Sequence, residues 1–340
     1  MNLLINLENI KSNIRSIKTY TKKEIIAVVK SNAYGLGATK IIKTLLKEKV
    51  NYFFFNKLSE YLNVKELLKD SNVMIFESLS VKNICKYYTS NMILTINSYD
   101  DLINYQKTNM NLRTHLQVDT GMNRIGIRTK EEANKIIQNK SDKIYIEGIY
   151  THYASSKDEY DYFSLQQEKF KEFLKLYDFK IIHSNASSSL HKNIIGNYVR
   201  VGMALYGYHC KLDLKASVNG YVKVINILKL EKDSKVGYEG LYQTSNKENI
   251  ALLDFGYFDS SLIKHVYLNN KKYMFLGKTC MNHSYVLVDK KINNLSHLRL
   301  FNKFDIIDRD KYDYYKILTS FNHLKKNYIE RIWIWNTLLS

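Results

Sequence analysis

Residues 25–29 read Ile-Ile-Ala-Val-Val, an apolar run that ends at Lys30. Its length and its β-branched residues are typical of a strand buried on both faces. Seven similar runs follow, and most are separated by helix-like segments such as 41–46, 58–68, 131–137 and 163–177. Eight strands alternating with helices predict an α/β fold, a parallel (β/α)8 barrel of the TIM type. The expected strands are 25–29, 52–55, 73–76, 92–96, 114–118, 144–150, 181–183 and 199–205.

The pattern changes after about residue 215. Strand-like runs then follow one another with turn residues and little helical pattern between them, which is typical of a smaller, mostly β domain. These runs are 221–230, 250–257, 266–268, 273–276, 285–288, 304–307 and 332–335. We therefore expect a barrel domain over residues 1–215 and a mostly β domain over residues 216–340.

Composition narrows the class of protein. The 340 residues are 45% hydrophobic and 25% charged, as in ordinary globular proteins. The sequence has neither a membrane-spanning apolar run nor a signal peptide, so a cytoplasmic protein with no membrane partner is expected. The net charge of +18 comes from lysines spread along the whole chain, which indicates a solvated surface and no nucleic-acid partner. Three scattered cysteines (Cys85, Cys210 and Cys280) predict neither a disulfide framework nor a metal site.

Lys30 occupies the position where barrels keep their chemistry, directly after a strand. On its own it has two interpretations. One is a lysine that reaches solvent or an ion-pair partner. The other is a lysine that forms a Schiff base, because burial would lower its pKa toward that of a useful nucleophile.

The residues around Lys30 favour the second interpretation. Residues 27–37, Ala-Val-Val-Lys-Ser-Asn-Ala-Tyr-Gly-Leu-Gly, resemble the cofactor-attachment motif of the alanine racemase family. Further segments resemble motifs of that family in the family's order: 118–126, 150–154, 199–207, 236–240 and 277–281. The resemblance implies a pyridoxal 5'-phosphate enzyme that interconverts L-alanine and D-alanine and so supplies D-alanine for cell-wall peptidoglycan. It also implies a homodimer with shared active sites.

The resemblance assigns the reacting groups and the residues around the cofactor ring. Lys30 would hold the cofactor and act as the base on one face of the substrate's α-carbon. Tyr238 of the other subunit would act on the opposite face, because inversion needs one group to remove the proton and another to return it. Arg200 would donate to the pyridine nitrogen, His152 would lie beside the ring, and His183 would support Arg200.

The remaining roles concern the phosphate and the substrate. The resemblance implies that Tyr34, Ser187 and the backbone amides of Gly202 and Met203 bind the phosphate, with Tyr315 as an addition. Arg124 and the backbone of Met281 would place the substrate carboxylate, and Tyr257 would line the entrance. A guanidinium suits a carboxylate because it can donate two parallel hydrogen bonds.

Several positions depart from the family pattern. Gln117 stands where many members carry a carbamylated lysine whose negative charge orients the substrate arginine. A neutral amide can accept a hydrogen bond from Arg124 but cannot supply that charge, so we expect either a nearby anion or a looser Arg124. Further departures weaken the assignment of alanine as the preferred substrate: Leu36, Ala186, Ser260 and Asn282.

Other functions stay open at this point. One is a broad-specificity or serine racemase, and another is a basic amino-acid decarboxylase on a similar scaffold. Decarboxylases favour an acidic partner for the ring nitrogen, so Arg200 argues against the second. A non-catalytic cofactor carrier would lack the β domain that bears Tyr238. A nucleic-acid-binding module would bind in a salt-sensitive way.

Overall fold

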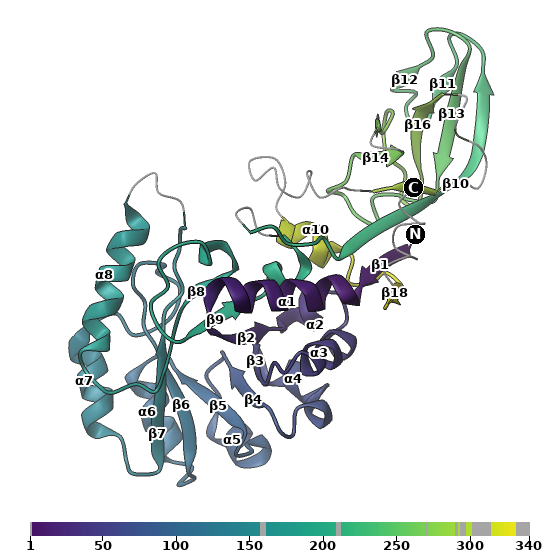
Figure 1. Ribbon diagram of the computed structural model, residues 1–340. Helices are drawn as coiled ribbons and strands as arrows, with labels where there is room; N and C mark the ends of the chain where they lie inside the picture. Colours follow the sequence, from purple (N-terminus) through teal and green to yellow (C-terminus); the bar gives the residue numbers. More distant parts are fainter. Residues whose placement is uncertain are drawn as a thin grey trace.

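A closed barrel and a mostly β domain make up the computed structural model (Figure 1). It describes residues 2–156, 161–208, 212–268, 271–289, 292, 297–300 and 314–330. Eight strands pair in parallel in sequence order, and the last closes onto the first. The predicted (β/α)8 barrel with a smaller, mostly β domain is confirmed. The barrel strands are β2 (Glu24–Val28), β3 (Tyr52–Phe55), β4 (Asn72–Ile75), β5 (Met92–Ile96), β6 (Leu112–Gln117), β7 (Ile144–Tyr150), β8 (Ile181–Ala186) and β9 (Tyr198–Val201).

Amphipathic helices cover the outside of the barrel. In the first of them, Ile10, Ile14 and Ile17 recur at helical spacing and are fully buried. Three of the helices begin with a side-chain cap that stabilises their first turn. The capping residues are Ser80 for α5, Ser98 for α6 and Thr129 for α7, and each side chain accepts a hydrogen bond from the backbone N–H three residues further along. The helices are α1 (Leu7–Thr21), α3 (Ala38–Lys47), α4 (Leu58–Leu62), α5 (Val81–Tyr87), α6 (Tyr99–Gln106), α7 (Lys130–Asn139) and α8 (Tyr162–Leu174).

Two expected elements are shorter than predicted. The helix expected over residues 58–68 ends at Leu62, and a separate 3-10 turn, η1 (Lys65–Leu67), follows. The strand expected over residues 199–205 ends at Val201, and η3 (Met203–Tyr206) begins after Gly202. In both places most of the apolar residues are buried, but the backbone turns.

The second domain is a mostly antiparallel sheet extended from one long strand, β10 (Val218–Leu230), and its one parallel pair among the described strands is β1 with β18. That strand pairs with β1 (Asn2–Asn6), β13 (Glu248–Leu253) and β17 (His297–Arg299). The N-terminal strand therefore belongs to this sheet, and α1 carries the chain into the barrel (Figure 1). The division after residue 215 stays a prediction. The other elements are η2 (Ser187–Ser189), β11 (Lys235–Val236), β12 (Tyr242–Gln243), β14 (His265–Leu268), β15 (Lys271–Met274), β16 (Ser284–Val288), α10 (Tyr314–Ser320) and β18 (Lys326–Ile329).

Some sequence-based expectations concern residues that are not described. The strands expected over residues 304–307 and 332–335 lie outside the described residues. Within the described ranges, no helix has the length and apolar character needed to cross a membrane.

Side chains on the barrel strands alternate between two cores. One face packs against the surrounding helices, as with Leu112 and Leu116 of β6. The other face fills the barrel interior, where an apolar layer forms from Ile26, Tyr52, Phe54, Met74, Ile93 and Tyr150. This layer closes the floor of the cavity described next, because Phe54 and Tyr150 also line that cavity.

Candidate active site

A cavity of about 400 Å³ opens at the carboxyl ends of the barrel strands. That volume is within the range of pockets that hold small molecules. Among the described residues, three basic side chains and no acidic one line it, so it favours an anionic occupant. The lining residues are Val28, Lys30, Tyr34, Phe54, Asn56, Phe76, Arg124, Tyr150, His152, Ala186, Ser187, Arg200 and Gly202.

Lys30 is presented to this cavity by an unusual turn, α2 (Lys30–Tyr34). Ser31, Asn32, Ala33 and Tyr34 all have φ between 53° and 58°, so the turn is left-handed although none of the four is glycine. Such a conformation costs about 1–2 kcal/mol per residue. Backbone strain of this kind persists only where the surroundings over-determine it.

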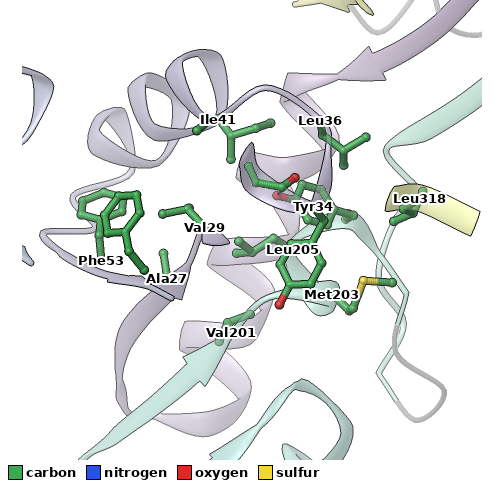
Figure 2. Packing of buried hydrophobic residues seen from close by; sticks show 14 of the residues in the cluster. Ala27, Val29, Tyr34, Leu36, Ile41, Phe53, Val201, Met203, Leu205 and Leu318 are labelled. Carbon is green, nitrogen blue, oxygen red and sulfur yellow. Dashed lines mark hydrogen bonds between the residues drawn. The ribbon is translucent and has the colours of Figure 1, made fainter. Parts of the chain in front are cut away.

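Packing and one side-chain cap hold the turn in place. Tyr34 and the following Leu36 lie in a buried cluster with Met203, Leu205 and Leu318 (Figure 2). The Asn32 side-chain carbonyl accepts a hydrogen bond from the Ala38 amide at 2.8 Å, which starts α3. Leu36, one of the departures from the family pattern, therefore belongs to the packing behind the turn.

The carboxylate of Glu60 joins this turn to the loop after β3. It accepts from the backbone amides of Ser31 at 2.8 Å and Asn56 at 3.0 Å. Burial lowers the pKa of Lys30, the positive charge of Arg124 lowers it further, and Glu60 opposes both. A lowered pKa leaves more of the amine neutral, as a nucleophilic or proton-accepting lysine requires.

Arg200 of β9 is almost fully buried and uses most of its donors inside the protein. Its Nη1 donates to Nδ1 and to the backbone oxygen of His183, at 2.8 Å and 2.6 Å. Its Nη2 donates to the backbone oxygens of Thr151 at 2.6 Å and Ser184 at 3.0 Å. A guanidinium has five N–H donors. The remaining Nε–H has no acceptor among the described residues, so Arg200 can offer one donor to a molecule in the cavity.

Two histidines beside Arg200 are held neutral. Burial, followed by the charges of Arg200, Arg124 and Lys30, lowers the pKa of His152 to about 3. Burial and then Arg200 lower the pKa of His183 well below its ordinary value. Both histidines contact Arg200, since Nη2 also lies 3.3 Å from Nδ1 of His152.

Ser187, Gly202 and Tyr34 meet at the side of the cavity near the ends of β8 and β9. The Ser187 hydroxyl accepts from the amides of Gly202 at 3.0 Å and Ala204 at 3.2 Å. A hydroxyl also has one proton to donate, and no acceptor for it occurs among the described residues. A Cβ on Gly202 would lie 2.1 Å from the Tyr34 hydroxyl, so only glycine fits there. Met203, which follows Gly202, is buried and begins η3.

Gln117 makes its side-chain hydrogen bonds to two residues other than Arg124. Its side-chain carbonyl accepts from the Tyr150 hydroxyl at 2.6 Å, and its amide donates to the backbone oxygen of Ile125 at 2.9 Å. Arg124 is exposed and lies over the ring of Phe76, 5.3 Å from its centroid. Gln117 therefore holds the backbone of the residue after Arg124 and not the Arg124 side chain.

Three predicted residues do not line the cavity of their own chain. Tyr238, Tyr257 and Met281 lie in the second domain and are 64%, 49% and 53% exposed. The Tyr257 amide donates to the Cys280 backbone oxygen at 3.0 Å, which places Tyr257 beside Met281. Tyr315 lies in α10, but its side chain is outside the described part of the structure.

Tyr150 is a site residue that the sequence analysis passed over. Its ring is stacked on His183, with centroids 4.7 Å apart, and Arg200 lies 5.3 Å from its centroid. The sequence did carry a signal, because Tyr150 ends an apolar strand, the position where barrels keep their chemistry. Nothing in the local pattern indicates that its side chain bonds to Gln117.

Comparison with known proteins assigns both parts of the chain. Residues 5–210 match the family model "Alanine racemase, N-terminal domain", and residues 218–322 match "Alanine racemase, C-terminal domain". An alanine racemase of Fusobacterium nucleatum is 29% identical over 326 residues, which cover 91% of each chain. One of Streptococcus agalactiae is 31% identical over 275 residues, 75% of each chain.

Solved structures show the same fold. An alanine racemase from E. faecalis has a TM-score of 0.86 at 23% identity, covering 96% of this chain and 97% of that one. One from Bartonella henselae, solved with covalently bound pyridoxal phosphate, has a TM-score of 0.84 at 26% identity. That match covers 96% of this chain and 99% of the other.

Proposed function

Because the chain belongs to the alanine racemase family, a family of enzymes, we propose that it interconverts L-alanine and D-alanine with pyridoxal 5'-phosphate. The observation that carries this proposal is Lys30, an amine of lowered pKa that shares a basic cavity with Arg200. The D-alanine formed would serve as a precursor of cell-wall peptidoglycan.

Residues along the cavity could bind each end of the cofactor. The Ser187 hydroxyl proton, Tyr34 and the Met203 amide would bind the phosphate. The Gly202 amide would join them by exchanging its hydrogen bond to Ser187, and the absence of a Cβ allows close approach there. Lys30 would hold the aldehyde end covalently. When bound, pyridoxal phosphate supplies an electron-withdrawing ring that makes the α-carbon proton of an amino acid removable. The cofactor seen in the Bartonella henselae relative supports this assignment.

Arg200 would set the electronic character of the ring. Burial lowers its pKa to about 10, which still leaves it charged near neutral pH. A charged guanidinium can only donate, so the ring nitrogen facing its Nε–H has to remain an acceptor. A ring whose nitrogen is unprotonated withdraws electron density from the α-carbon less strongly. Arg200 therefore favours simple proton exchange over decarboxylation, which argues against the decarboxylase alternative.

Two proton carriers on opposite faces would complete the reaction. The Lys30 amine takes the α-proton from one face, and the Tyr238 hydroxyl returns a proton to the other; the reverse reaction exchanges these roles. Tyr238 is exposed on its own chain, which supports a role for its side chain in the active site of a neighbouring subunit. Arg124 and the backbone of Met281 would hold the substrate carboxylate, and Tyr257 would lie at the entrance.

An exposed surface on the second domain supports the proposed homodimer. Tyr238, Leu241, Tyr257, Phe258 and Met281 are each between 49% and 66% exposed. Large apolar side chains gathered in this way are typical of an interaction surface. A second copy seated there would bring Tyr238 of the partner subunit to the cavity around Lys30.

The test uses the purified chain with added pyridoxal phosphate. It should convert L-alanine to D-alanine and exchange the α-proton with deuterated water. Tyr238→Phe should keep the cofactor and lower racemisation by roughly 10²- to 10⁴-fold. Tyr20→Phe, at a tyrosine of α1 that is 54% exposed, is the matched control and should leave the rate unchanged. Undiminished racemisation by Tyr238→Phe would refute the two-base scheme.

The same assay separates the substrate alternatives. The rate of serine racemisation tests the broad-specificity alternative. That alternative stays open because the chain departs from the family pattern at Leu36, Ala186, Ser260 and Asn282. Carbon dioxide released from lysine or ornithine, without D-alanine from L-alanine, would instead favour a decarboxylase.

A further inference from the structure

A line of buried polar side chains runs through the barrel from Arg200 toward the opposite mouth. His183 contacts Arg200, His115 contacts His183, and Glu147 lies next to His115. Arg113, near the start of β6, pairs with Glu147 through two hydrogen bonds of 2.9 Å and 3.1 Å. His115, Glu147 and Arg113 have no part in the function proposed above.

The strand pattern explains why these groups meet. On β6, Arg113 and His115 are two residues apart and so point to the same side, the barrel interior. On β7 a bulge opposite Thr114 and His115 changes the register next to Glu147. The following residue, Gly148, leaves room for the histidine, because a Cβ there would lie 2.6 Å from Nε2 of His115.

The N–H donors of Arg200 determine which atom donates and which accepts in each hydrogen bond along this line. A guanidinium has no acceptor, so Nδ1 of His183 has to accept from Nη1. A neutral His183 then carries its proton on Nε2 and donates it to Nδ1 of His115, 3.0 Å away. His115 in turn carries its proton on Nε2. That atom faces two acceptors, the Tyr52 hydroxyl at 3.3 Å and the Glu147 carboxylate at 3.6 Å.

The reverse direction would place two donors against each other. If His115 donated from Nδ1 instead, His183 would carry its proton on Nδ1, directly facing the N–H of Arg200. Burial also lowers the pKa of both histidines, so an extra proton on either is unfavourable. Burial alone would raise the pKa of Glu147, but His115 and Arg113 hold it below its ordinary value. The carboxylate therefore stays an acceptor at the end of the line.

We propose that His115 and Glu147 are positioning residues for Arg200. They keep the proton of His183 on Nε2, so that Nδ1 of His183 accepts from Nη1 of Arg200. Arg200 is thereby held with its own Nε–H directed into the cavity. The effect on cofactor binding rests on the proposed function. The tautomers themselves do not, since they follow from contacts within the protein.

The first test reads the tautomers directly. The full chain, labelled with ¹⁵N-histidine and prepared without added cofactor, gives ring nitrogen signals that distinguish Nδ1–H from Nε2–H. Both His115 and His183 should be Nε2–H, with each signal assigned by its loss in the matching variant. An Nδ1–H form of either residue would overturn the proposal, whether or not the protein racemises alanine.

The second test compares two substitutions of similar size, His115→Asn and His115→Leu. Asparagine keeps an oxygen that can accept from His183 near the position of Nδ1, whereas leucine keeps only the volume. The dissociation constant for pyridoxal phosphate should be about tenfold higher in His115→Leu than in His115→Asn, the equivalent of one hydrogen bond. Equal constants in the two variants would overturn the proposal. If neither variant folds, the tautomers of the unmodified chain still decide.

Discussion

The bond between Gln117 and Tyr150 offers a quantitative test of how the barrel holds the segment after β6 that carries Arg124 and Ile125. Gln117 is 2% exposed and Tyr150 is 1% exposed, and the Tyr150 hydroxyl donates to Gln117 at 2.6 Å. Gln117→Leu leaves that hydroxyl with Thr95, at a long 3.3 Å, as its remaining partner. A buried polar group left without a good partner costs about 1–3 kcal/mol. Ile125, the other partner, is 36% exposed, so water can replace its lost bond.

A double-mutant cycle isolates the interaction. Tyr150→Phe should also cost about 1–3 kcal/mol, because it leaves the Gln117 carbonyl unpaired. The double variant should lose less than the sum of the two, with a coupling energy of about 1 kcal/mol or more. Urea unfolding followed by circular dichroism gives the three free energies. Gln117→Leu combined with Thr44→Val, on the outer helix α3, is the control and should be additive.

The same substitution should act on the substrate. Gln117 holds the backbone oxygen of Ile125, the residue after Arg124, so Gln117→Leu should raise the KM for alanine more than it lowers kcat. Additive free energies to within about 0.5 kcal/mol would refute the structural reasoning. If neither Gln117→Leu nor Gln117→Lys changed substrate affinity or turnover, the role given to this position would be wrong.

Further predictions concern acid stability, the phosphate side of the cavity and the strained turn. Burial lowers the pKa of His152 to about 3, whereas an unfolded histidine takes up its proton near pH 6.5. Stability should therefore fall by roughly 2 kcal/mol between pH 7 and pH 5 through this group. Urea unfolding of His152→Gln should show a shallower pH dependence, and an unchanged slope would contradict this. Gly202→Ala places a Cβ 2.1 Å from the Tyr34 hydroxyl and should weaken pyridoxal phosphate binding about tenfold or more in absorbance titrations, at a stability cost of about 1–3 kcal/mol. Wild-type affinity in that variant would argue against a phosphate site there. Ser31 has φ 53° and an exposed side chain, so Ser31→Gly should be more stable than Ser31→Ala by about 1 kcal/mol in thermal unfolding, and equal stability would mean that the turn is not strained.

The barrel could be predicted from the sequence because its signal is local. Strands β3, β5 and β7 begin and end at the residues expected from their apolar runs. The first strand, β1, could not be placed in this way. Its pairing with β10 and β18 joins the two ends of the chain, and no local pattern encodes such contacts.

The site was less predictable for two physical reasons. The left-handed turn runs against the backbone preference of Ser31, Asn32, Ala33 and Tyr34, so only the packing around it decides its shape. The partner of Gln117 depends on the register between β6 and β7, which a bulge shifts. Sequence reasoning could name Gln117 as a departure, but only the three-dimensional register shows that its carbonyl meets Tyr150.

The most direct test of this account is to find which lysine binds the cofactor. The purified chain is incubated with pyridoxal phosphate, reduced with borohydride, digested and analysed by mass spectrometry. The account predicts one modified peptide, with the pyridoxyl group on Lys30 among the 43 lysines of the chain, and no visible cofactor absorbance in Lys30→Ala. An unmodified Lys30, or label spread over surface lysines in both proteins, would contradict it.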